Sequence, residues 1–119
     1  THPNLCDLSS KDQIEHELFY SKKKLEKDFE ISIHSMAYPF GGIEHINEEV
    51  IKYISQYYTY CYSNIRGDNT ISTSPLAIRR QNITPDMPIT YLGFIIEGGL
   101  DWYWVNHRNQ LDKFVLSAI

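Results

Sequence analysis

The sequence of 119 residues is long enough for one domain with a modest core, or for part of a larger domain. Its formal net charge of −4 argues against a nucleic-acid partner, because phosphate binding relies on clustered lysine and arginine. It contains no apolar run near the roughly 20 residues of a transmembrane helix, and no N-terminal apolar stretch typical of a signal peptide, so the compartment stays open.

The two cysteines, Cys6 and Cys61, are too few for a disulfide framework, and their spacing is not that of a zinc site. We therefore favour two free thiols over a disulfide bond.

The first predicted helix covers residues 11–27. Ser10 stands three positions before Gln13, which is the pattern of a capping box at a helix start. Apolar residues such as Ile14 and Leu18 then recur near helical spacing. The run of lysines at 22–24 falls on the polar flank, so we expect these side chains to be solvated.

Residues 29–37 alternate in polarity and contain β-branched side chains, which predicts a strand. The strand should end at Tyr38-Pro39-Phe40-Gly41-Gly42, because proline cannot donate a hydrogen bond in a strand ladder and paired glycines allow a sharp exit.

The remaining elements continue an alternation of helices and strands. A helix is predicted from about Asn47 to residue 58, followed by a short strand at 59–63, a loop at 64–75 and an extended segment at 76–83. Residues 89–96 fit a short helix and a buried strand equally well, and the tail is predicted to be helical from about Trp104. This alternation indicates an α/β fold with short parallel strands.

Two segments carry a resemblance to a known family. The chain begins Thr1-His2-Pro3-Asn4-Leu5, and Tyr38-Pro39-Phe40-Gly41 follows after one amphipathic helix. In this order they resemble two active-site segments of the polysaccharide deacetylases, the NodB-like esterases of carbohydrate esterase family 4. The resemblance covers about residues 1–83.

The resemblance implies a role for each segment. His2 would be one of two histidine ligands of a divalent metal, commonly zinc; its partner would stand four positions earlier, where this sequence has no residue. The backbone N–H of Phe40 would donate to the oxyanion of the reaction. Tyr38 and Pro39 would lie against the substrate. For His2 alone, a histidine without function is the simpler interpretation.

Two further residues are weaker candidates. Arg80 stands in Arg80-Gln81-Asn82-Ile83, which resembles a family segment whose arginine pairs with an active-site carboxylate, although a surface arginine fits as well. Trp102 could stack on a sugar ring, but packing is the interpretation that we favour.

The sequence also departs from the family pattern. Ala37 stands where some members have an arginine that orients the catalytic aspartate. The chain has no Asp-Asp pair to supply the general base and a metal ligand, and no late Leu-x-His segment to supply a general acid. We therefore expect the base and the acid to lie outside this chain.

Together these features imply that residues 1–119 form the later part of a polysaccharide deacetylase domain, a portion of an irregular (β/α) barrel, with 84–119 as a C-terminal extension. The intact protein would remove acetyl groups from an N-acetylated or O-acetylated polysaccharide. A polymer substrate favours the cell exterior or envelope, but the residues themselves leave the compartment open. A missing N-terminal half, or another chain, would complete the site, so we expect the chain alone to be inactive. The alternative is a non-catalytic deacetylase-like module that binds glycans or other partners.

Overall fold

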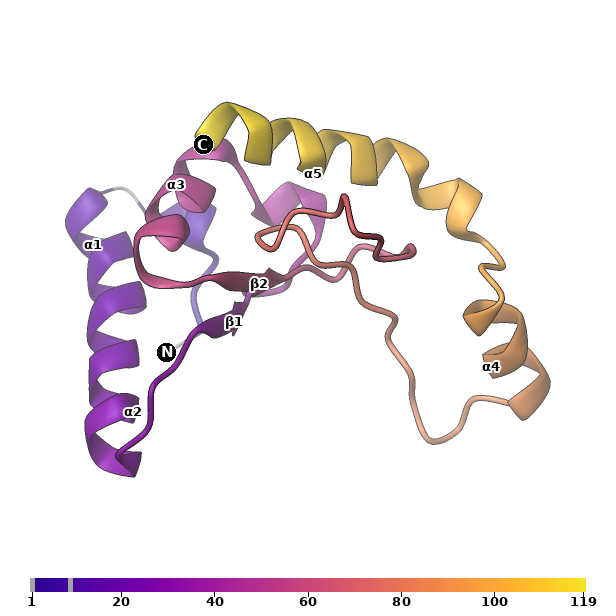
Figure 1. The fold of residues 1–119 in the computed structure, drawn as a ribbon, viewed down its shortest axis with the longest axis horizontal. Helices are drawn as coiled ribbons and strands as arrows, with labels where there is room; N and C mark the ends of the chain where they lie inside the picture. Colours follow the sequence, from indigo (N-terminus) through magenta and orange to yellow (C-terminus); the bar gives the residue numbers. More distant parts are fainter. Residues whose placement is uncertain (1, 9) are drawn as a thin grey trace.

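A helical arm begins the chain in the computed structural model, which describes residues 2–8 and 10–119. After a short 3-10 turn at Leu5–Asp7, α1 (Lys11–Glu15), a π-helical turn (His16–Tyr20) and α2 (Ser21–Phe29) follow without a break (Figure 1). The Ser10 hydroxyl accepts a hydrogen bond from the Gln13 N–H at 3.3 Å, so the predicted helix start is confirmed.

The same arm corrects one prediction. The Lys22 side chain is only 14% exposed, whereas the Lys23 side chain is 60% exposed. The Lys22 ammonium donates to the backbone carbonyls of Ile33 and Tyr57, at 2.5 and 2.7 Å. The prediction of a solvated Lys22 was therefore wrong, because this side chain bridges two segments that are distant in the sequence.

A small parallel sheet lies beside this arm. Strand β1 (Ser35–Ala37) pairs in parallel with β2 (Tyr60–Tyr62), and Met36 stands opposite Cys61. A single parallel bridge from Tyr62 to Ile78 places a third segment along the other edge of β2. The strand predicted at 29–37 is shorter than expected, because α2 continues to Phe29 and ends at Glu30 in the left-handed conformation, with φ of 53°.

Helix α3 (Glu48–Tyr57) connects the two strands. The Asn47 side chain accepts a hydrogen bond from the Val50 N–H at 2.8 Å and caps the helix where the sequence indicated its start. A β-strand, a helix and a parallel β-strand follow one another here, so the predicted mixed fold with parallel strands is confirmed.

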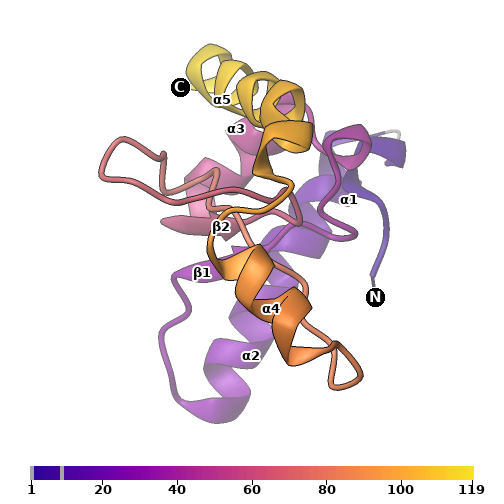
Figure 2. The ribbon, with the colours of Figure 1, turned by 90° about the vertical axis from the view of Figure 1, so that its right-hand side faces the viewer.

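Two helices follow the sheet. Helix α4 (Ile89–Ile96) resolves the open choice for this segment in favour of a helix, and it stands at the far end of an extended segment, away from α3 (Figures 1 and 2). A 3-10 turn (Asp101–Trp104) leads into α5 (Val105–Ala118), which lies across α3. The helix predicted from about Trp104 is thereby confirmed.

One hydrophobic core unites the arm, the sheet, α3 and α5. Its buried members include Ile14, Leu18, Ile51, Ile54, Cys61, Ile65, Ala77, Leu111 and Val115. Cys6 and Cys61 are both free thiols, as expected. Among the described residues, no helix combines the length and the apolarity needed to cross a lipid bilayer.

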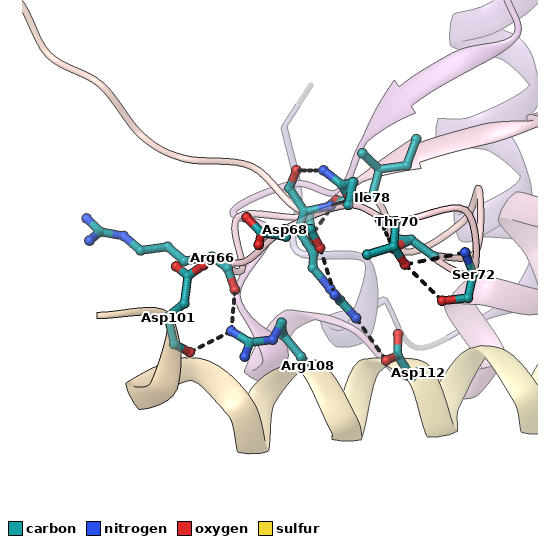
Figure 3. Close-up of polar contacts among 12 residues, drawn as sticks. Arg66, Asp68, Thr70, Ser72, Ile78, Asp101, Arg108 and Asp112 are labelled. Carbon is teal, nitrogen blue, oxygen red and sulfur yellow. Dashed lines mark hydrogen bonds and ion pairs between the residues drawn. The ribbon is translucent and has the colours of Figure 1, made fainter. Parts of the chain in front are cut away.

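Polar contacts attach the loop between β2 and α4 to the last helix. The Arg108 guanidinium donates to the carbonyl oxygens of Arg66 and Asp101, at 3.1 and 2.6 Å (Figure 3). One residue before Arg80, the Arg79 side chain pairs with the Asp112 carboxylate on α5 at 3.0 Å. These contacts hold the segment that continues to Arg80 in a defined position.

Candidate functional site

The candidate site lies where three parallel segments end. β1 ends at Ala37, β2 ends at Tyr62, and the third segment has its bridge at Ile78. Because the carboxyl ends of parallel strands meet at one edge of a sheet, the residues that follow them come together there. They surround a cavity of about 410 Å³, which is lined by His2, Ala37, Tyr38, Phe40, Asn64, Arg80, Gln81 and Asn82.

Phe40 has an unusual backbone conformation. Its φ is +61°, and the Gly41 N–H donates to the Pro39 carbonyl at 2.7 Å, which closes a three-residue turn around Phe40. A side chain on Gly41 would lie 2.8 Å from the backbone nitrogen of Asn64, so this position requires glycine. Non-glycine residues in the left-handed region cost about 1–3 kcal/mol and cluster at functional sites.

The turn leaves the Phe40 N–H without a hydrogen-bond partner among the described residues. The Phe40 side chain is 55% exposed and also lines the cavity. A free backbone donor at the end of a strand is the kind of group that stabilises an oxyanion in acyl transfer. The predicted role of Phe40 is thus compatible with its geometry and stays a prediction.

His2 lies next to this turn. Its ring meets the Phe40 ring edge to face, with 5.0 Å between the ring centroids. Besides the main cavity, His2 lines a smaller one of about 210 Å³ together with Pro39. The His45 ring also lies near Phe40, with 5.2 Å between the ring centroids. Thr1, the first residue of the motif, lies outside the described residues.

The described residues do not fit a metal site by themselves. Among them, no group of three or more histidine, cysteine, aspartate or glutamate side chains is placed to hold a metal ion. Catalytic zinc needs three protein ligands and an open position, and His2 would supply one of them. The role of His2 as a ligand therefore stays a prediction that requires ligands from elsewhere.

Arg80 reaches the cavity from the third segment. Its Nε donates to the Ser63 carbonyl at 2.8 Å, and its backbone N–H donates to Ile65 at 3.2 Å. The two terminal nitrogens of the guanidinium have no hydrogen-bond partner and no carboxylate within ion-pair distance in the described part of the chain. They form a positive group that is available to a carboxylate or a substrate oxygen.

The side chain of Tyr38 is turned into the core. It is 2% exposed, and its hydroxyl donates to the Leu76 carbonyl at 2.8 Å. Burial raises the pKa of this hydroxyl far above its ordinary value. Tyr38 lines the cavity, although its hydroxyl is committed to the protein interior, and its contact with a substrate stays a prediction.

Trp102 is not among the residues that line the cavity. It is 74% exposed and packs edge to face on Tyr103, with 6.0 Å between the ring centroids. Pro39 lines the smaller cavity rather than the larger one. Contact of either residue with a substrate stays a prediction.

Three amide side chains of the cavity had no predicted role: Asn64, Gln81 and Asn82. The available signal was their position, because Asn64 directly follows the strand predicted at 59–63 and Asn82 stands in the segment of Arg80. Polar residues at the carboxyl ends of parallel strands commonly form binding sites.

Comparison with known proteins gives a family resemblance. No protein-family model matches the chain, and no match was found among curated proteins. Two solved structures match 81% of the chain. They are BC0361, a polysaccharide deacetylase from Bacillus cereus (25% identity, TM-score 0.66), and BA0330 from Bacillus anthracis, described as a polysaccharide deacetylase (26% identity, TM-score 0.69).

The resemblance to polysaccharide deacetylases is confirmed. The chain spans 29% of the length of each of these two deacetylase structures. It shares with them a mixed arrangement of helices and a small parallel sheet.

Proposed function

We propose that this chain carries one part of the active site of a metal-dependent polysaccharide deacetylase. The main support is that Phe40, whose N–H has no hydrogen-bond partner among the described residues, lines one cavity together with His2 and Arg80 at the carboxyl ends of parallel strands. The substrate class is an acetylated glycan, by analogy with the two deacetylase structures. A portion of a (β/α) barrel is the architecture that this proposal implies.

The residues of the chain would act on the acetyl group in two ways. The Phe40 N–H would donate to the carbonyl oxygen as negative charge develops on it, and removal of such a donor in comparable sites costs about 10²–10³ in rate. Arg80 would place positive charge near the reacting groups. The described side chains do not form a metal site by themselves. Zinc is the ion that the proposal expects, and further ligands would have to come from outside these residues.

The first experiment measures acetate release from N-acetylchito-oligosaccharides by the intact protein and by residues 1–119 alone. We expect release by the intact protein only, because the base, the acid and further metal ligands are proposed to come from a missing N-terminal half or another chain. Acetate release by residues 1–119 without any other chain would contradict the proposed division of the site.

A second experiment addresses Phe40 in the intact protein. Replacement of Phe40 by phenyllactic acid changes its N–H to an ester oxygen and keeps the ring. We expect kcat to fall by about 10²–10³. Phe40→Leu is the matched control, since it keeps the N–H and removes the ring. An ester variant as active as the control would remove Phe40 from the oxyanion site.

A non-catalytic glycan-binding module is the second candidate. It is favoured by the lack of a three-ligand group among the described residues. Zinc titration of the intact protein separates the two candidates: the enzyme predicts that His2→Ala weakens zinc binding by about tenfold or more, whereas the exposed control His34→Ala does not. Glycan binding without acetate release, with equal zinc affinity in both variants, would favour the binding module.

A further inference from the structure

The cavity has two walls of different chemistry. Phe40 and His2 form an aromatic wall, and their rings contact each other. The other part of the lining comes from the ends of the other two parallel segments and consists of Asn64 and the run 80–82. No aspartate or glutamate is among the residues that line the cavity. The lining is therefore polar without being acidic, and Arg80 is its cationic group.

Two amides of this wall are available to a ligand. Asn64 and Asn82 are exposed, and neither side-chain amide has a hydrogen-bond partner among the described residues. By contrast, the Gln81 amide is turned toward the Asp101 carboxylate, with 3.5 Å between Nε2 and Oδ1. The wall is thus held through Gln81 and presents Asn64 and Asn82 to the cavity.

The position of Asn64 is fixed relative to the turn of Phe40. Its backbone N–H donates to the Gly41 carbonyl at 2.8 Å, and a Cβ added to Gly41 would lie only 2.8 Å from the Asn64 backbone nitrogen. On the third segment, the Arg80 side chain bonds to the Ser63 carbonyl, one residue before Asn64. The amide wall and the Phe40 turn therefore form one connected unit.

An amide offers two donors and one acceptor, and a sugar hydroxyl both donates and accepts. A volume of about 410 Å³ falls within the range of about 300–1,000 Å³ that is usual for small-molecule sites. Amide side chains that share a cavity with an exposed aromatic ring are suited to a sugar ring, whose apolar face can lie on the aromatic ring while its edge hydroxyls reach the amides.

We propose that Asn64 and Asn82 bind ring hydroxyl groups of the glycan in this cavity and so determine which sugar residue is accepted. This inference rests on the proposed function for the identity of the substrate, since the wall itself identifies only a hydroxyl-rich ring. It adds two specificity-determining residues that act on substrate binding rather than on the chemical step.

The test measures two quantities on the intact protein: the Kd for N-acetylchito-oligosaccharide and the rate of acetate release. Asn64→Ala and Asn82→Ala should each raise Kd by about two- to tenfold, the range for one uncharged hydrogen bond, with kcat within about twofold of wild type. Asn106→Ala, an exposed asparagine on α5, is the matched control and should leave both quantities unchanged.

Deoxy-sugar analogues exclude a purely structural effect. One analogue should lack the hydroxyl that Asn82 binds. With that analogue, Asn82→Ala should no longer change Kd, because the two changes delete the same interaction. Unchanged Kd values in both alanine variants, or equal losses with every analogue, would overturn the inference. If the wild-type protein releases no acetate, the proposed function is refuted. The role of the two amides is then still decided by the Kd values.

Discussion

Tyr38 anchors the turn that presents Phe40. Its backbone N–H donates to Tyr62 at 3.0 Å, and its hydroxyl donates to the Leu76 carbonyl at 2.8 Å. The residue therefore connects the end of β1 to both neighbouring segments. The strained conformation of Phe40, with φ of +61°, persists because the residue before Pro39 is fixed in this way.

Removal of the Tyr38 hydroxyl tests this anchor. Tyr38→Phe leaves the Leu76 carbonyl without its buried donor, and we expect the free energy of unfolding to fall by about 1–3 kcal/mol. The control is Tyr60→Phe on β2, because Tyr60 is 44% exposed and should change stability by less than about 0.5 kcal/mol. Urea denaturation measures both variants. Equal stability of the two variants would show that the Leu76 bond does not support the fold.

The buried thiol of Cys61, near Tyr38, makes the stability of the fold depend on pH. Burial raises the pKa of its thiol to about 12, and burial also raises the pKa of the Tyr38 hydroxyl. The unfolded chain ionises these groups at lower pH than the folded chain does. Their contribution to stability is therefore complete below about pH 9, the ordinary thiol value, and decreases as the pH rises toward 12.

We expect the urea concentration at the midpoint of unfolding to fall steadily above about pH 9.

Iodoacetamide should modify Cys6 before Cys61 in the folded protein, because Cys61 is fully buried. Mass spectrometry of the alkylated protein identifies the modified thiol. Faster modification of Cys61 than of Cys6 in the folded state would contradict its burial.

At the level of single residues, the sequence predicts the site only where a motif exists. His2, Phe40 and Arg80 were named in advance through the family resemblance, and the structure brings them to one cavity. Asn64 was not, because an asparagine after a strand is common in turns and has no local signal of function. Its proximity to Phe40 depends on the pairing of β1 with β2, which single residues do not reveal.

Helical elements were predicted well where local signals are strong. The capping pattern at Ser10 predicted one helix start, and the helix predicted from about Asn47 also begins there. In both cases a capping side chain bonds to a backbone N–H only three residues away. The strand predicted at 29–37 was too long, because alternation cannot reveal that α2 continues to Phe29. The role of Lys22 was missed because its two partners, Ile33 and Tyr57, lie outside its own helix and are not revealed by the helical pattern.

The contact of α2 with the rest of the fold can be tested at Lys22. Its ammonium joins the end of α3 to the segment before β1, with bonds to Tyr57 and Ile33, so Lys22→Ala leaves two carbonyls without a charged donor. We expect a loss of about 2–3 kcal/mol in the free energy of unfolding. Lys23→Ala is the neighbouring control and should cost less than about 0.5 kcal/mol. Thermal unfolding of both variants is sufficient, and equal melting temperatures would refute the bridging role.

On the scale of the whole molecule, the two C-terminal helices differ in their attachment. Helix α5 contributes Leu111 and Val115 to the core shared by the arm, the sheet and α3. In α4, by contrast, Ile95 is the buried residue, and Ile89 and Ile96 are largely exposed. The alternation of helices and strands predicted a parallel sheet, but the sequence could not predict that α5 crosses α3, because that contact joins segments about 50 residues apart in the chain.

The attachment of α5 leads to a last prediction. Leu111 is fully buried and Leu116 is 81% exposed, although both lie on the same helix. Leu111→Ala leaves a cavity in the core to which α5 contributes, and we expect it to lower the free energy of unfolding by about 2–5 kcal/mol. Leu116→Ala should change it by less than about 0.5 kcal/mol. If α5 is part of the same cooperative unit, circular dichroism and the fluorescence of Trp102 and Trp104, in the turn that leads into α5, report one common transition in Leu111→Ala, shifted to lower urea concentration. Loss of the α5 signal alone, with the remaining helices unchanged, would show instead that α5 unfolds independently of the sheet that carries the site.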